Sequence, residues 1–348
     1  MSRQLRATKF RALSLSDPFF DSLKAGYRGF ESWFNSKADE ELYVIEDGRR
    51  LSGMIYLKHE NGAVSDVDPP LPSKRWLKIG TLKIEGKGTK LGERVLKKVF
   101  DRAISENREG IYVTVFELHA NLIRLFERYG FKRYGVKRSD DGTELVLARI
   151  FDDLVGDLVT DYPFFRTRGR KSWLLAVYPE FHSQLLPDSI LRNEPREIVQ
   201  DVSHTNTIHK VYIGRLSLTR MQRGDLVIIY RTTDIPRRAF YRSVVTSICV
   251  IEETKTKKDF DDEESFIRYA MPHSVFTKDE LRHWYAGDRF YVAKMTYNSA
   301  FNSRITRGRL LEEVGITTHP RWDLRELTDA EVQAILEMGK VNARLVVD

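Results

Sequence analysis

The chain has 348 residues, more than one hydrophobic core usually organises, so two domains are expected. Hydrophobic residues make up 41% of the sequence, and no apolar run is long enough to cross a bilayer, which argues against a membrane protein. The first residues lack the apolar stretch of a secretion signal, and the one cysteine, Cys249, cannot form an internal disulfide. We therefore expect a cytoplasmic protein.

The charge is distributed unevenly. Residues 1–150 hold 28 Lys and Arg against 21 Asp and Glu, whereas residues 151–348 hold 29 of each. Within the neutral half, residues 201–250 hold 8 basic and 3 acidic residues. Two basic regions favour a polyanionic partner, either a nucleotide cofactor or a nucleic acid. The alternative is that many of these side chains only solvate helix surfaces.

The first half alternates strands and helices. Its turn signals and hydrophobic periods predict the following elements in chain order: a strand at 6–13, a helix at 17–40, a strand hairpin at 41–60, a strand at 75–85, a helix at 89–107, a strand at 110–118, a helix at 119–131 and a hairpin at 132–150. The helix at 119–131 places Leu122, Leu125, Phe126 and Tyr129 on one face, and Gly130 ends it.

The second half is richer in strands. A segment that joins aromatic residues to three basic ones, residues 153–170, is the predicted linker between domains 1–152 and 171–348. Beyond it the sequence predicts strands at 172–179, 209–217, 224–233, 240–253 and 289–297, with helices at 266–287, 307–315 and 328–340. The expected fold class is α+β, with a small, mainly antiparallel β-barrel and appended helices in the second domain.

One stretch of the first half, "LKIEGKGTKLGERVL", reads as a strand, a glycine-containing turn and a helix. The first N–H groups of such a helix have no partner within the helix and lie at the positive end of its dipole, so they suit an anion. The stretch is not a P-loop, because Gly88 stands where that motif requires Ser or Thr, and no G-x-G-x-x-G fingerprint is present.

This order of elements, with the segment "NLIRLFERYGF", resembles the GNAT superfamily of N-acetyltransferases over residues 1–150. The cofactor motif of that superfamily maps onto residues 87–92, where Lys90 replaces the middle glycine. The resemblance implies an acetyl-CoA site in which the backbone of Leu82 and Ile84 holds the pantetheine arm. It further implies that residues around the turn and the two helices contact the cofactor: Lys87, Gly88, Thr89, Lys90, Leu91, Gly92, Glu93, Asn121 and Phe126.

The resemblance also implies direct attack of an amine on the thioester, with a tyrosine that protonates the leaving thiolate. That tyrosine is expected at position 126, where this chain has Phe126. Tyr129 is the substitute candidate for this acid, and a packed or surface tyrosine is its alternative. Glu117 and His119 are candidates for the base that deprotonates the amine, although a histidine at a helix start is also typical of a cap.

The turn and strand "GDLVIIY" with the basic segment 201–250 resemble the PUA-like superfamily, which includes ASCH and EVE domains, over residues 170–300. The resemblance implies binding of RNA or modified bases. Its candidate contacts are Trp173, Tyr178, His182, His209, Lys210, Tyr230, Arg231, Tyr241 and Arg242, of which Trp173 and Tyr178 also suit a core. The pattern of hydrolytic ASCH domains is missing, and His182, His204 and His209 have no zinc-like spacing, so we predict no metal site.

The function expected from these features is acetyl-CoA-dependent N-acetyl transfer to an RNA base or to the aminoacyl group of a tRNA, with the second domain selecting the acceptor. Two alternatives remain at this stage. One is a CoA-binding reader of modified nucleic acid, or a regulator of the toxin–antitoxin type with a protein partner, that turns over weakly. The other is a protein N-acetyltransferase.

Overall fold

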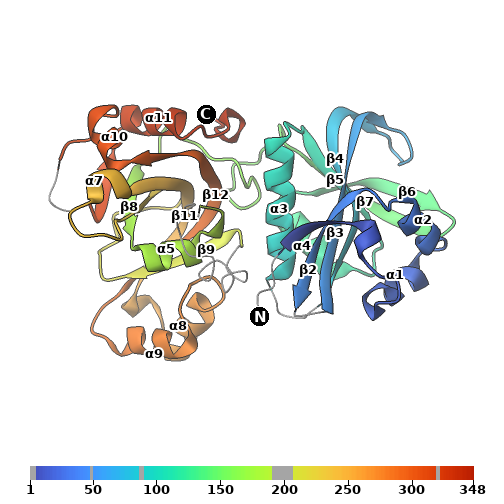
Figure 1. Ribbon diagram of the computed structural model, residues 1–348, viewed down its shortest axis with the longest axis horizontal. Helices are drawn as coiled ribbons and strands as arrows, with labels where there is room; N and C mark the ends of the chain where they lie inside the picture. The colour runs from blue at the N-terminus through green and yellow to red at the C-terminus, as the bar shows by residue number, and fades with distance from the viewer. Residues whose placement is uncertain (1–4, 48–49, 86–89, 190–206, 319–321) are drawn as a thin grey trace. The chain divides into compact units, whose positions relative to one another are not determined.

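The computed structural model describes residues 5–47, 50–85, 90–189, 207–318 and 322–348 (Figure 1). The chain forms two compact units, Met1–Asp161 and Tyr162–Asp348, and this division falls inside the segment predicted as a linker. The linker segment is itself folded in part. The side chain of Asp161 accepts hydrogen bonds from the backbone N–H groups of Val155 and Gly156, so these residues close a turn at the end of the first unit.

The first unit is built on a seven-stranded sheet with the order β1-β2-β3-β4-β5-β7-β6. All neighbours are antiparallel except β4 and β5, which run parallel. The strands are β1 (Leu5–Lys9), β2 (Glu41–Asp47), β3 (Arg50–Val64), β4 (Leu71–Ile84), β5 (Gly110–Val115), β6 (Lys132–Ser139) and β7 (Gly142–Ile150). The hairpin predicted at 132–150 is confirmed, with Gly142 at its turn in the left-handed region at φ +126°.

Four α-helices accompany this sheet: α1 (Asp21–Gly26), α2 (Phe30–Ser36), α3 (Leu91–Ser105) and α4 (Ala120–Arg128), with short 3₁₀ helices η1 (Phe10–Ala12) and η2 (Pro18–Phe20). The helix predicted as one element at 17–40 is therefore wrong. Tyr27 is extended and Gly29 adopts φ +74°, a conformation that suits glycine, so the chain turns between α1 and α2. Helix α3 connects the parallel strands β4 and β5.

The second unit is built on a six-stranded sheet with the order β13-β8-β10-β11-β12-β9, in which only β8 and β10 are parallel. Its strands are β8 (Ser172–Val177), β9 (His209–Gly214), β10 (Leu226–Arg231), β11 (Val244–Thr256), β12 (Tyr291–Thr306) and β13 (Leu324–Leu327). The expected α+β class is observed, and the closure of this sheet into a barrel stays a prediction.

The helices of the second unit are α5 (Pro179–Leu185), α7 (Ala239–Arg242), α8 (Glu263–Ala270), α9 (Lys278–Ala286), α10 (Arg307–Glu312) and α11 (Asp329–Met338), with 3₁₀ helices η3 (Pro187–Ser189), η5 (Lys257–Asp259) and η6 (Ala343–Leu345). The single helix predicted at 266–287 is wrong, because the chain breaks between α8 and α9. Helix α9 has its own start signal, a capping box in which Thr277 and Glu280 satisfy each other's backbone N–H groups.

Candidate functional site

Strand β4 leaves its neighbour β5 halfway along its length. In the described part of the chain, β4 pairs with β5 only from Trp76 to Ile79, whereas its pairing with β3 continues to Ile84. Gly80 is the residue skipped in the β3–β4 register, and a Cβ atom there would lie 2.9 Å from the ring of Tyr56. A bulge of this kind bends a strand away from its partner. The backbone after Gly80 is therefore open on the side that β5 vacates.

Leu82 and Ile84, predicted to hold a pantetheine arm, lie on this open part of β4 and are partly buried. An unpaired strand edge offers N–H and C=O groups to an extended ligand in the way that it would offer them to another strand. Both residues therefore lie on the part of β4 that has no pairing with β5 among the described residues, and their contact with a pantetheine arm stays a prediction.

The start of α3 lies beside the end of β4. A Cβ atom at Gly92 would lie 2.8 Å from the Leu125 side chain and 4.0 Å from that of Ile84, so the first turn of α3 meets both α4 and β4. The N-cap residue, Lys90, makes no side-chain capping hydrogen bond, and the first N–H groups of a helix suit an anion. Lys87, Gly88 and Thr89 lie outside the described residues.

Tyr129 and Glu93 form a buried tie between α4 and α3. The Tyr129 side chain is fully buried, and its hydroxyl donates a 2.7 Å hydrogen bond to Glu93 Oε1 in the first turn of α3. This geometry does not favour Tyr129 as the acid of the reaction, because its proton is already committed to a carboxylate in the interior. Leu91 is buried as well, so it contributes packing beside the backbone N–H groups.

Phe126 is buried on the inner face of α4, with its ring centroid 4.8 Å from that of Phe131. Its side chain therefore packs the interior, and the predicted contact with a cofactor is not seen in this arrangement. Asn121 lies at the start of α4 and is exposed, but its side-chain oxygen accepts a hydrogen bond from Arg124. The end of the helix at Gly130 is confirmed, since Gly130 adopts φ +81°.

Glu117 and His119 are exposed in the loop between β5 and α4. His119 is the N-cap residue of α4, yet its side chain makes no capping hydrogen bond, so the imidazole is available for another role. Both candidate bases therefore stand at the end of β5, on the strand from which β4 diverges.

Sequence reasoning missed Tyr27 and Glu144 near this loop. The Tyr27 ring packs 5.4 Å from that of Phe116, and its hydroxyl donates to Glu144 Oε1 on β7 at 3.1 Å. Burial, and then the charge of Glu144, raise the pKa of Tyr27 far above its usual value, so its hydroxyl remains protonated. No local pattern signals this contact, because the periodicity predicts Tyr27 inside one continuous helix.

In the second unit, most of the predicted nucleic-acid contacts are interior residues. Trp173 is fully buried in the core and its indole N–H donates to Asp225, while Tyr230 packs against Trp322. These two predictions are wrong as surface contacts, since a base cannot stack on a ring that other side chains cover. The same burial removes four polar side chains from the accessible surface: His182, His209, Lys210 and Arg231.

The buried polar residues instead form a network on β9, β11 and β12. The Nδ1 atom of His209 donates to Glu252, whose second oxygen lies 3.1 Å from Lys294 Nζ. Burial opposes ionisation of Glu252, but the His209 hydrogen bond and the nearby charges hold its pKa below the usual value. Lys210 Nζ lies 5.4 Å from the centre of the Tyr297 ring. These residues form a cluster of buried and partly buried polar side chains on three neighbouring strands.

His182 is buried at the edge of that interior, where its Nε2 atom shares a 2.8 Å hydrogen bond with Thr246. Burial, followed by the charges of Arg231 and Arg304, lowers the pKa of His182 to about 3. The imidazole is therefore neutral at physiological pH. His204, the third histidine of the region, lies outside the described residues.

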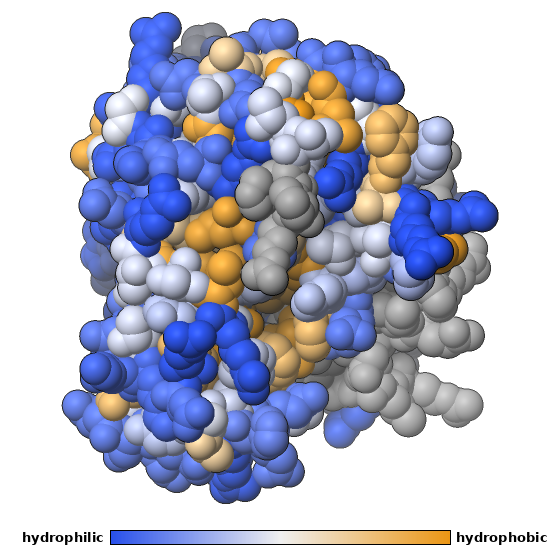
Figure 2. All heavy atoms as spheres, turned by 90° about the vertical axis from the view of Figure 1, so that its left-hand side faces the viewer, coloured by the Kyte–Doolittle hydropathy of each residue, from blue (hydrophilic) through white to orange (hydrophobic). Residues whose placement is uncertain are grey.

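Tyr178 and Tyr241 are the exposed candidates, and Arg242 is partly exposed. Tyr178 and Tyr241 are 68% and 76% exposed, and Arg242 forms a bidentate pair with Asp234. Tyr241 and Arg242 belong to a basic segment at 235–242, called the loop at 235–242 here although its last four residues form the single turn of α7. The segment also holds Arg237 and Arg238, which have no ion-pair partner among the described residues. The face of the second unit in Figure 2 is largely hydrophilic, with apolar side chains gathered in smaller areas. The loop at 235–242 combines exposed rings with cations, as a single-strand surface requires.

No protein-family model matches the sequence, and no curated protein matches it. Solved structures of both predicted kinds match the fold. The ASCH protein from Zymomonas mobilis matches 49% of this chain and 96% of its own length at 14% identity and TM-score 0.34. A GNAT family acetyltransferase from Elizabethkingia anophelis with acetyl-CoA bound matches 42% and 98% at 12% identity and TM-score 0.31, and an IAA acetyltransferase from Bacillus cereus matches 43% and 99% at 12% and 0.34.

Neither a metal-ion cluster nor a membrane-spanning helix is found among the described residues. Among the residues that the structure describes, no group of three or more His, Cys, Asp or Glu side chains is arranged to hold a metal ion. Of the helices in the described ranges, none combines the length and the apolar character needed to cross a membrane.

Proposed function

We propose that the chain is an acetyl-CoA-dependent N-acetyltransferase whose second unit selects a nucleic-acid-linked acceptor, either an RNA base or the aminoacyl group of a tRNA. The observation that carries the proposal is the divergence of β4 from β5 directly beside the uncapped start of α3. One continuous surface thereby offers backbone groups for an extended arm and a helix N-terminus for its phosphates.

In this arrangement each group of the chain has a defined task. Acetyl-CoA, when bound, supplies an acyl group on a thiolate leaving group. The backbone N–H groups on the open part of β4 orient the thioester and stabilise negative charge that develops on its carbonyl oxygen. Glu117 or His119, exposed at the end of β5, accepts the proton of the incoming amine. Tyr27, whose hydroxyl stays protonated and donates to Glu144, does not act as a base.

The first test is cofactor binding. Lys90→Glu places a negative charge at the start of α3, so the dissociation constant for acetyl-CoA should rise about tenfold or more, since helix N-termini favour anions. Lys132→Glu is the matched control, because Lys132 is an exposed lysine of the same unit that pairs with Asp153. Isothermal titration distinguishes the two variants. Equal affinity of wild type and Lys90→Glu would remove the proposed phosphate site.

The second test is acetyl transfer. Total RNA and total protein are incubated with isotopically labelled acetyl-CoA and the chain, and the label is located by mass spectrometry. Label in RNA or on aminoacyl-tRNA, lost with Lys90→Glu and kept with Lys132→Glu, supports the proposal. Label in protein alone would replace the nucleic-acid acceptor with a protein acceptor.

A second candidate function is a CoA-binding reader that turns over weakly. It is favoured by the buried Tyr129–Glu93 hydrogen bond and by Phe126, because neither α4 side chain presents a hydroxyl to a leaving thiolate. A free thiol has a pKa near 8.5, so water can protonate the thiolate and turnover does not require such a group. Acetyl-CoA binding without label in any acceptor would favour the reader.

A further inference from the structure

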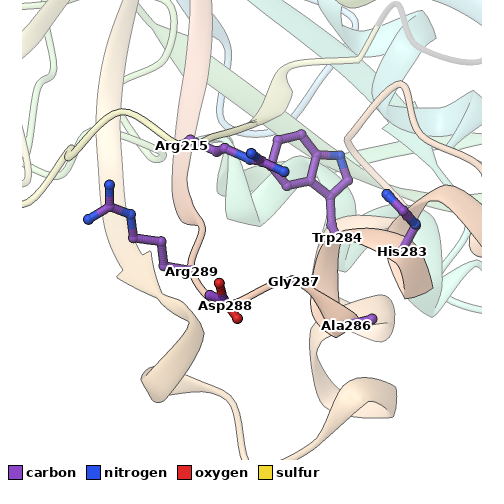
Figure 3. A pocket seen from close by; sticks show the side chains of 7 residues that line it. All are labelled: Arg215, His283, Trp284, Ala286, Gly287, Asp288 and Arg289. Atoms are coloured by element: carbon purple, nitrogen blue, oxygen red, sulfur yellow. The ribbon is translucent and has the colours of Figure 1, made fainter.

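A pocket of about 500 Å³ lies in the second unit, away from the buried network and from the loop at 235–242 (Figure 3). Three chain segments meet there: the residue after β9, the last turn of α9, and the loop that leads to β12. The pairing of Gly214 with Tyr291 brings these segments together. The lining residues are Arg215, His283, Trp284, Ala286, Gly287, Asp288 and Arg289.

The indole ring of Trp284 forms a fixed wall of this pocket. Helix α9 is anchored by its capping box and by the fully buried Leu281. The edge of Phe276 packs on Trp284 with ring centroids 5.8 Å apart, and Phe276 in turn packs on Phe181. The ring is therefore held before any ligand arrives, and its partly exposed surface lines the pocket.

Two arginines of the pocket have no ion-pair partner among the described residues. Arg215 and Arg289 are exposed, and neither has a hydrogen bond or ion pair with another described residue. Figure 3 shows Arg215 extending toward the Trp284 ring. The carboxylate of Asp288 also lines the pocket. The pocket thus holds two guanidinium groups against one carboxylate, with an exposed imidazole, His283, beside them.

The other carboxylates of this region are already satisfied. Asp279 accepts a hydrogen bond from Arg282 at 2.9 Å, and Glu280 accepts the backbone N–H and the hydroxyl of Thr277. The carbonyl oxygen of Gly287, at the end of α9, accepts from Lys257 Nζ at 2.8 Å. Asp288 is thus the one lining carboxylate among the described residues that could offset the two arginines, and an anionic ligand is the complement that the excess of positive charge favours.

We infer that this pocket binds one nucleotide of a single-stranded RNA, with the base against Trp284 and a phosphate on Arg215 and Arg289. Guanidinium groups bind phosphate oxygens through two parallel hydrogen bonds, and an exposed indole stacks on any base. The pocket volume lies within the range of about 300–1,000 Å³ typical of small-ligand sites. An acidic peptide could use the cations, but it has no planar group to match the fixed ring. The inference rests on the proposed nucleic-acid-linked acceptor.

The test is fluorescence anisotropy of a labelled single-stranded oligoribonucleotide of mixed sequence, titrated with the full chain at several salt concentrations. Arg215→Ala with Arg289→Ala should weaken binding at least tenfold at low salt. It should also reduce the slope of log K against log salt by about 0.7, because the two arginines share one phosphate and each phosphate contact on a single strand contributes about 0.7. Trp284→Leu, which keeps apolar contact with Phe276, should weaken binding about tenfold and leave the slope unchanged.

The control is Lys258→Ala with Arg268→Ala, which removes two exposed charges from neighbouring elements outside the pocket. The inference is overturned if this pair weakens binding as much as the arginine pair, if Trp284→Leu has no effect, or if adenosine monophosphate or an acidic peptide binds the pocket while the oligoribonucleotide does not. Acetyl-CoA titration is run in parallel. If the wild-type chain binds acetyl-CoA but not the oligoribonucleotide, the pocket alone is overturned. If it binds the oligoribonucleotide but not acetyl-CoA, the acetyltransferase alone is overturned.

Discussion

The candidate ligand surface of the first unit is made of backbone groups, whereas that of the second unit is made of side chains. In the first unit the central strand β4 gives up its partner after Ile79, so the surface is unpaired backbone. In the second unit β10 is paired on both sides at all six of its residues, and the accessible chemistry is carried by side chains on loops and helices around the sheet. An open backbone recognises a generic extended arm, whereas rings and guanidinium groups on loops can read a particular partner.

The largest expected effect tests whether the polar interior of the second unit is structural. Glu252→Ala should destabilise that unit by about 3 kcal/mol, because the buried His209 ring and the partly buried Lys294 ammonium would both lose the carboxylate that they contact. Urea unfolding measures the change. Glu253→Ala is the control, since its half-exposed side chain should cost about 1 kcal/mol or less. A small effect at Glu252 would mean that this network is free to serve a ligand.

The next effect is a pH dependence at His182. Its folded pKa of about 3 lies below the ordinary histidine value of 6.5, so between these values the unfolded chain binds a proton that the folded chain excludes. Stability from this group is complete above pH 6.5 and falls by about 1.4 kcal/mol per pH unit as the pH drops toward 3. His182→Gln should flatten that slope relative to wild type in urea unfolding at pH 7 and pH 5. Parallel slopes would contradict the burial assigned to His182.

A moderate effect is expected at the tie between α3 and α4 in the first unit. Tyr129→Phe removes the donor to Glu93 and should cost about 1–2 kcal/mol, while the rate of acetyl transfer at saturating substrate stays unchanged. Thermal unfolding and a thiol-release assay separate the two readouts. A slowed rate without loss of stability would restore Tyr129 as the acid.

The smallest effect concerns the loop at 235–242. Arg237→Ala with Arg238→Ala should leave stability within about 0.5 kcal/mol, because these residues are exposed and have no described ion-pair partner. RNA affinity should fall a few-fold at low salt and converge with wild type at high salt. An unchanged low-salt affinity would confine recognition to the pocket at Trp284.

Much of the fold could be predicted from residue patterns. The period of Leu91, Val95, Val99 and Ala103 predicted α3, and all four side chains are buried. The turn at Asp141-Gly142 predicted the hairpin. The parallel strands β4 and β5, which α3 connects, were also predicted as strands. The break at Tyr27–Gly29 and the short strand β13 were missed, because a glycine inside an apolar period and a four-residue strand both give weak local signals.

The strand and the helix that carry the candidate site could be predicted from the sequence. The burial of individual side chains could not. Leu82, Ile84 and Gly92 lie where the strand–turn–helix pattern predicts them. In β9, however, the adjacent residues His209 and Lys210 are both fully buried, which breaks the alternation that a strand exposed on one face would show. A charged residue in such a strand is predicted to lie on the surface, because the sequence does not show which other elements pack over it. The pocket at Trp284 joins residues 215 and 284, which no local motif connects.

The bulge at Gly80 has a consequence for rates. The separation of β4 from β5 begins at Gly80, where any side chain would collide with Tyr56. The two strands are therefore already apart, and an arm can lie between them without first separating them. Association with acetyl-CoA should then be a single step, with an observed rate that rises linearly with concentration and reaches no plateau.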